Sequence, residues 1–149
     1  MRYATIGTVS SDTLRDDDLI SAFSWEIEHL AKGNHLPKAL RQTVRELLRD
    51  VAAYDDERLE YDPSELVDAL QDCLGEFAPP YAYFGTHDGD GAHFGFWPIT
   101  DDDCLPRLND MAELEDYRGE DVYLVNDHGN VTCGRLARNG RFVEYWSCV

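Results

Sequence analysis

The hydrophobic pattern of this 149-residue chain changes its period at Pro79 and Pro80. Before the two prolines, apolar residues recur every three or four positions, which places them on one face of a helix. After them, apolar and polar residues alternate, as in strands that are buried on one side. Because a proline stops a helix, the pair separates the two regions. The pattern predicts an α+β fold in which helices come first and an antiparallel sheet follows.

Capping signals divide the first region into three helices. Thr13 with Asp16 fits a capping box at the start of the first helix, and Gly33 suits its C-terminal end. A second helix follows, and Asp62 is expected to cap the third. A short strand is expected ahead of the helices, at residues 3–9.

The second region predicts a sheet of about five strands, with the three helices packed on one face. The hairpin signal Asn139-Gly140 between the last two strands is the strongest in the chain. No repeat or linker is visible, so we expect a single α+β domain over residues 1–149. The expected strands are 81–86, 92–97, 121–126, 131–137 and 141–149.

The net charge of −17, from 30 acidic and 13 basic residues, indicates what the protein binds. Such a field repels nucleic acid and anionic membranes and attracts basic protein surfaces. The only basic excess in the pattern is weak, at Arg135, Arg138 and Arg141. The acids are clustered, since residues 54–76 and residues 101–127 each carry a net charge of −8.

Two interpretations of the acidic clusters stay open. They are solvated loops that serve solubility or salt adaptation, or they imitate the charge of a nucleic acid and occupy the basic groove of a nucleic-acid-binding protein. In the second case, aromatic side chains would add buried area to the contact. The candidate partner-contacting residues are Asp55, Asp56, Glu57, Asp101, Asp102, Asp103, Glu113, Glu115, Asp116, Tyr81, Tyr83 and Trp97.

The stretch YAYFGTHDGDGAHFGFWP, residues 81–98, is either a tight turn between aromatic strands, a partner surface or a metal site. Its potential ligands are His87, Asp88, Asp90 and His93. The spacing excludes an EF-hand, because Ala92 and Ile99 stand where acidic ligands are required. A register that pairs His87 with His93 is favoured, since it places both histidines on one face and gathers the phenylalanines on the other.

Catalytic motifs are weak. In the segment Asn126–His128, His128 could act as a general base with Asp127 as its orienting carboxylate, and Cys133 as nucleophile, but the segment is also typical of an ordinary hairpin turn. No Rossmann, P-loop or G-x-S-x-G pattern is present, and no cofactor is predicted. None of the four cysteines forms a C-x-x-C pair, and no signal peptide or long apolar run occurs. We therefore expect a cytoplasmic protein with reduced thiols.

The stretch at residues 81–98, together with VYLVNDHGNVT and the early IGTVSSDTLRDDDLI, resembles a group of small acidic proteins encoded by phages, prophages and plasmids. The resemblance implies a mobile-element setting and supplies no catalytic residues. In that setting it implies a possible action against host defences, as an anti-CRISPR or anti-restriction protein.

The sequence therefore favours a binding protein without enzymatic activity, which inhibits a basic nucleic-acid-binding defence complex of the host as a DNA mimic. The alternatives are a small metal-dependent enzyme that uses the His87–His93 loop and an accessory protein without an inhibitory role.

Overall fold

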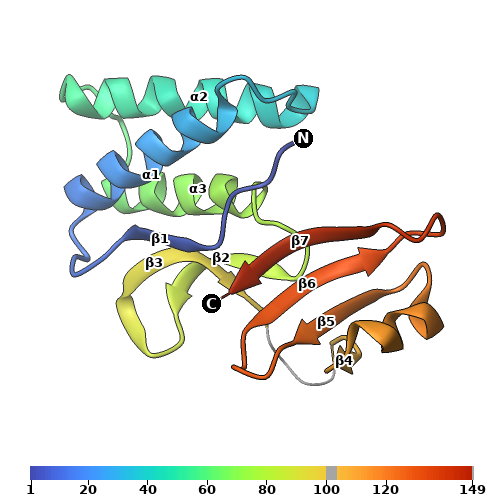
Figure 1. Ribbon diagram of the computed structural model, residues 1–149. Helices are drawn as coiled ribbons and strands as arrows, with labels where there is room; N and C mark the ends of the chain where they lie inside the picture. The colour runs from blue at the N-terminus through green and yellow to red at the C-terminus, as the bar shows by residue number, and fades with distance from the viewer. Residues whose placement is uncertain (100–103, 149) are drawn as a thin grey trace. The chain divides into compact units, whose positions relative to one another are not determined.

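The structure is a computed structural model that describes residues 1–99 and 104–148 (Figure 1). Its contacts group into two compact units, one of Met1–Ala78 with Tyr83–Trp97 and one of Pro79–Ala82 with Pro98–Val149. That the whole chain folds as a single domain stays a prediction. Across the described residues, no helix has the length and apolar character needed to cross a membrane.

The first unit combines helices with a three-stranded sheet, whose strand order is β1-β3-β2. The helices lie on one side of that sheet (Figure 1). In chain order its elements are β1 (Gly7–Ser10), α1 (Asp16–Ala31), α2 (Lys38–Asp55), α3 (Pro63–Gly75), β2 (Ala82–His87) and β3 (Asp90–Pro98).

Aromatic side chains form the centre of the first unit. Phe23 of α1 meets Phe84 and Phe94 edge to face, with ring centroids 5.2 and 5.4 Å apart. Phe96 packs on Phe84 at 4.9 Å, and the helices add a leucine-rich layer to the same cluster. The alternation of β2 and β3 and the helical period of α1 to α3 thus converge on one core.

The helix ends confirm two sequence signals and correct one. Asp62 caps α3 by accepting a hydrogen bond from the Ser64 backbone N–H at 2.9 Å, and Gly33 follows α1 with φ of +69°. The predicted capping box of Thr13 and Asp16 is wrong, because the N-cap of α1 is Arg15 and it makes no side-chain cap bond.

The second unit holds a four-stranded sheet, whose strand order is β4-β5-β6-β7. The 3₁₀ helix η1 packs on it through Leu114, which joins Leu108, Val122 and Leu136 in a small core. The predicted hairpin at Asn139-Gly140 is confirmed, since it connects β6 to an antiparallel β7. The elements are β4 (Arg107–Leu108), η1 (Met111–Tyr117), β5 (Asp121–Val125), β6 (Val131–Leu136) and β7 (Phe142–Cys148).

The α+β class is confirmed, but the prediction of one antiparallel sheet of about five strands is wrong. The strands of the described residues form two sheets, and β4 pairs parallel with β5. The N-terminal strand, observed at Gly7–Ser10, pairs with β3, which follows it in the chain only after the three helices and β2. The alternation of side chains determines which face of a strand is buried, but it does not determine which strand lies next to it. The pattern therefore could not predict how the strands divide into two sheets.

Asp121 organises the second unit. Its carboxylate accepts hydrogen bonds from Arg135 Nε and Nη2 at 2.6 and 2.8 Å, and from the hydroxyls of Tyr81 at 2.7 Å and Tyr145 at 2.8 Å. The side chain is 12% exposed. Burial of the carboxylate raises its pKa, but the bonds from Arg135, Tyr81 and Tyr145 outweigh burial, so the pKa of Asp121 lies below its usual value.

This cluster also holds a strained residue. Tyr81 has φ of +59°, a left-handed conformation that is unfavourable for a bulky side chain. Its hydroxyl donates to Asp121 and its carbonyl accepts from the Ile99 backbone N–H at 2.9 Å. The bond to Asp121 raises the pKa of Tyr81 to about 12, so the hydroxyl stays a donor at neutral pH.

Replacing Asp121 by Asn is expected to destabilise the protein by about 1–3 kcal/mol at pH 7, because Arg135 and two tyrosines lose a charged acceptor. Since the folded pKa of Asp121 is lowered, its contribution is present above the unfolded pKa of about 3.9 and is lost as pH falls through the folded pKa. Urea unfolding at pH 7 and pH 3 measures this, with the exposed Asp127→Asn as control. A difference from wild type that does not shrink at pH 3 would contradict the assignment.

Gly95 of β3 is expected to tolerate no side chain. A Cβ there would meet the carbonyl oxygen of Gly7 at less than a normal contact distance and Trp97 Cζ2 at 2.8 Å, whereas one at Gly91 would meet nothing within 4 Å. Gly95→Ala should lower stability by about 1–3 kcal/mol through overpacking, and Gly91→Ala should leave it within about 0.5 kcal/mol. Equal thermal midpoints for the two variants would show that β1 does not pack on β3 in this way.

Candidate functional site

Helices α2 and α3 form an antiparallel pair that carries much of the acidic cluster predicted at residues 54–76. Their antiparallel order is seen in one groove, which is lined by Leu40 from the start of α2 and by Cys73 from near the end of α3. The connection between them ends at Asp62, whose cap and the following Pro63 begin α3. The sequence of this connection therefore determines where α3 begins, and with it the places of the acids that follow.

Four carboxylates follow one another on the outer face of α3 and its C-cap, three or four residues apart. This spacing places them along one side of a helix. All four side chains are exposed, and within the described part of the chain none of them makes a side-chain hydrogen bond or ion pair. We name Glu65, Asp68, Asp72 and Glu76 the carboxylate row.

Helix α2 adds two carboxylates beside the pair. Glu46 accepts a hydrogen bond from Gln42 Nε2 at 2.9 Å, and Asp50 accepts one from the Tyr61 hydroxyl at 3.0 Å. Burial and then the bond to Asp50 raise the pKa of Tyr61 to about 12, so the tyrosine donates at neutral pH. These acids are held in place by neutral donors, and they keep their negative charge uncompensated.

The predicted contact residues Asp55, Asp56 and Glu57 lie at the end of α2. Asp56 forms an ion pair with Arg58, whereas Asp55 and Glu57 have no such partner among the described residues. Both line a shallow hollow of about 520 Å³ together with Tyr54 and Tyr61. The structure therefore brings this part of the prediction together on one surface.

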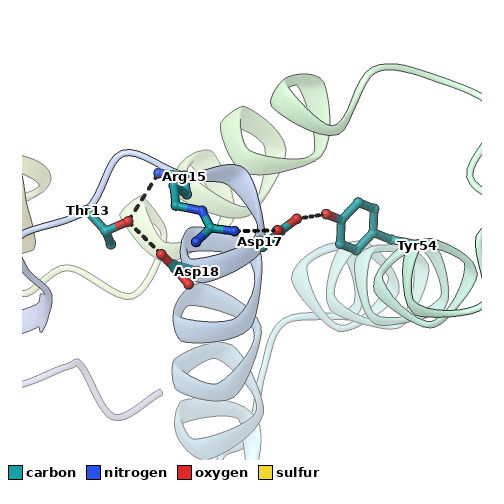
Figure 2. Close-up of polar contacts among 5 residues, drawn as sticks. All are labelled: Thr13, Arg15, Asp17, Asp18 and Tyr54. Atoms are coloured by element: carbon teal, nitrogen blue, oxygen red, sulfur yellow. Dashed lines mark hydrogen bonds and ion pairs between the residues drawn. The ribbon is translucent and has the colours of Figure 1, made fainter.

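The first turn of α1 lies beside the end of α2 and adds acidic residues to this surface. The sequence pattern did not predict this proximity. Figure 2 shows the Asp17 carboxylate between Arg15 and the Tyr54 hydroxyl, with Thr13 bonded to Asp18. The hydrogen bond to Asp17 is the main reason that the pKa of Tyr54 is raised, and the charges of Asp16 and Asp55 add to it. In the sequence alone, acids in the first turn of a helix are explained by their favourable interaction with the helix dipole. Only the packing of α1 on α2 brings Asp17 to Tyr54.

A groove of about 500 Å³ runs between α2 and α3. Leu40, Leu47 and Cys73 are buried at 8%, 7% and 3% exposure, and small side chains stand beside them. Glu46 and Asp50 continue the face of α2 that lines the groove, because they follow Thr43 by three and seven positions. The lining consists of Ala39, Leu40, Thr43, Leu47, Ala69, Asp72, Cys73 and Glu76.

The basic residues gather on a different face of α2. Arg41, Arg45 and Arg49 recur every four residues and are exposed, so the C-terminal arginines are not the only basic excess. Arg135, moreover, is paired with Asp121. The α2–α3 pair thus separates its charges, with acids toward the groove and arginines away from it.

The predicted acids of the second unit lie on η1 or outside the described residues. Glu113, Glu115 and Asp116 are exposed, and Glu115 accepts a hydrogen bond from Arg118 Nε at 2.7 Å. The remaining three predicted carboxylates, Asp101, Asp102 and Asp103, lie outside the residues that the structure describes.

The three predicted aromatic contacts have hydrogen-bonding roles inside the units. Trp97 Nε1 donates to the Gly85 carbonyl at 3.0 Å, the Tyr83 hydroxyl donates to the Thr86 carbonyl at 3.1 Å, and Tyr81 donates to Asp121. Tyr81 belongs to the second unit, and Tyr83 and Trp97 belong to the first. Their contact with a partner stays a prediction.

The histidine-rich hairpin shows the expected shared face. The rings of His87 and His93 lie 5.9 Å apart, and both meet the ring of Trp97 edge to face. His93 Nε2 shares a hydrogen bond of 2.7 Å with the Thr8 hydroxyl, and His87 Nδ1 accepts from the Gly89 backbone at 3.1 Å.

The two aspartates of this hairpin serve the turn. Asp88 lies 3.3 Å from the Tyr83 hydroxyl and shares its one proton with the Thr86 carbonyl, and Asp90 accepts from the Ala92 backbone at 3.0 Å. Across residues 1–99 and 104–148, no group of three or more His, Cys, Asp or Glu side chains is arranged to hold a metal ion. The geometry here is that of a hydrogen-bonded turn.

The proposed base and nucleophile near residue 128 do not gain support. Asn126 accepts hydrogen bonds from the His128 and Asn130 backbones, which is the geometry of a turn. Cys133 is fully buried, and burial, with the charge of Asp121, raises the pKa of its thiol to about 12. A thiol that stays protonated at neutral pH is a poor nucleophile.

No protein-family model, curated protein or solved structure is matched by this chain. The candidate site is therefore defined by its own geometry.

The cysteines are expected to differ in reactivity. Cys104 is exposed, whereas Cys73 and Cys133 are buried and burial raises their pKa values to about 11 and about 12. Iodoacetamide at pH 8 should therefore alkylate Cys104 long before either buried thiol, because the thiolate is the reacting form. Mass spectrometry of digests over time measures the order, and Cys104→Ser should remove the fast phase. Early labelling of Cys133 would contradict its place in the core.

Proposed function

We propose that the protein binds a basic, nucleic-acid-binding defence complex in the cytoplasm of the host cell and inhibits it as a DNA mimic, without enzymatic activity. The carboxylate row, with the acids of α2 beside it, is the contact surface. The observation that carries the proposal is the row itself: four exposed carboxylates without intramolecular partners in the described chain, on a face that also exposes an apolar groove.

The spacing of the row supports mimicry. From Glu65 to Glu76 the helix axis advances about 16 Å, which gives one carboxylate every 5–6 Å or so. A single strand of duplex DNA carries one phosphate about every 3.4 Å of axis. Glu46 and Asp50 of the neighbouring helix raise the density of charge along the same surface. Arginine and lysine side chains that grip a phosphate backbone would therefore meet carboxylates at comparable intervals.

The position of the row supports a binding role over solubility alone. Asp72 and Glu76 lie near the C-terminus of α3, where the helix dipole disfavours negative charge, and no basic residue stands in the last turn. Asp68 and Asp72, and Asp72 and Glu76, are like-charged pairs four residues apart, each of which costs about 0.2–0.5 kcal/mol. If these acids served solubility alone, they could stand at other exposed sites where they would not meet this repulsion.

The test neutralises the row in a single variant, Glu65→Gln, Asp68→Asn, Asp72→Asn and Glu76→Gln. It measures phage plating on hosts that carry one defined restriction or CRISPR system, and DNA binding by the purified defence complex with added protein. Where wild type inhibits, the variant should bind about tenfold or more weakly, since exposed ion pairs contribute up to about 1 kcal/mol each. Inhibition should also weaken as salt rises.

A matched control neutralises four exposed acids elsewhere, Asp12→Asn, Glu28→Gln, Glu120→Gln and Glu144→Gln, and changes the net charge equally. It should keep inhibition. The row variant should be about as stable as wild type, because the relief of like-charge repulsion offsets the lost interaction of Glu65 with the helix dipole, so unfolding would not explain its loss. Equal inhibition by both variants, or no inhibition of any defence system by wild type, overturns the proposal.

A further inference from the structure

We infer that the groove between α2 and α3 receives an amphipathic basic helix of the partner, with apolar side chains on the groove floor and lysines or arginines against the carboxylate row. The inference rests on the proposed function and specifies how the same surface recognises its partner.

The shape of the groove follows from its small side chains. Ala39 and Thr43 on α2 and Ala69 on α3 stand where larger residues would fill the space between the helices. Leu40 and Cys73, which are largely buried, form the apolar part of the lining. The volume of about 500 Å³ lies in the range of protein pockets that bind ligands.

The charge around the groove selects a cationic occupant. Asp72 and Glu76 line it directly, and none of the lining residues is basic. Neither carboxylate has an ion-pair partner in the described parts of the chain. Such a surface repels nucleic acid and anionic membranes. A partner with a lysine or arginine next to an apolar side chain can contact both the carboxylates and the apolar groove.

The occupant is helical because two antiparallel helices present ridges and a groove that a third helix can fill. The basic helix of a second copy of this chain does not fit. This arginine-bearing helix, α2, already buries its apolar face, with Val44 at 5% and Leu47 at 7% exposure. That helix would offer arginines without the apolar side chains that the groove floor requires.

The experiment uses two synthetic peptides with the same leucine and lysine content. One places its leucines at helical spacing on one face, and the other has the same residues in scrambled order. Calorimetry measures the affinity of each for the full-length protein. Wild type should bind the amphipathic peptide at least about tenfold more tightly than the scrambled one. Thr43→Trp fills the groove and should remove this preference.

Two further variants complete the test. Ala39→Trp fills the groove from a neighbouring exposed position and should act like Thr43→Trp, which guards against a folding defect in either variant. Ala52→Trp places the same side chain at an exposed site of α2 on the arginine-bearing side, and it should keep the preference. Far-ultraviolet circular dichroism and the thermal midpoint verify that each variant is folded.

Equal affinity of wild type for both peptides, lowered alike by neutralising the carboxylate row, overturns the groove inference and leaves the acidic binding surface intact. A preference that survives both groove-filling variants also overturns it. Failure of the proposed function shows separately, as a lack of inhibition in the plating and DNA-binding assays.

Discussion

The burial of one face of α3 governs the surface that this protein presents. Leu66, Leu70 and Leu74 are completely buried, and each such side chain contributes about 1.5–3 kcal/mol relative to an exposed one. Together they determine the rotation of the helix about its axis. The repulsion among the carboxylates on the opposite face amounts to a few tenths of a kcal/mol for each pair. The free energy of leucine burial therefore far exceeds the repulsion among the carboxylates. Burial of the leucines keeps the carboxylate row facing outward in spite of that repulsion.

The charges of α2 follow the same logic. Its first turn has no acid and begins with Lys38, and its last turn ends at Asp55 without a basic residue. This order is the reverse of what the helix dipole favours. The arginines lie on one side and the acids on the side of the groove, so the helix is polarised both along its axis and across it.

Local patterns predicted the elements, and nonlocal contacts decided what the elements do. The 3.6-residue period gave the three helices, and the chemistry of Asp62 and Gly33 gave ends that the structure confirms. The sheet was divided wrongly because pairing of β1 with β3 joins residues far apart in sequence. The capping box failed because the Thr13 hydroxyl bonds to Asp18 instead.

The candidate site likewise combines features that local patterns predict with features that depend on tertiary contacts. The carboxylate row follows from the helical spacing of four acids in residues 63–76, and a helical projection of that segment would have revealed it. Tyr54 and Asp17 meet only because α1 and α2 pack against each other. The groove depends on which small side chains face one another across two helices, and a one-dimensional pattern contains no such information.

In the proposed recognition by this surface, charge and shape would have different parts. Attraction between exposed charges acts over about 8 Å at physiological salt and weakens as salt is added, so it would gather basic partners without choosing among them. Apolar contact in the groove is short-ranged and is not screened. A partner held by the row alone would dissociate completely at high salt. A partner that also fills the groove would retain part of its affinity there, and this residual affinity is the physical mark of selection by shape.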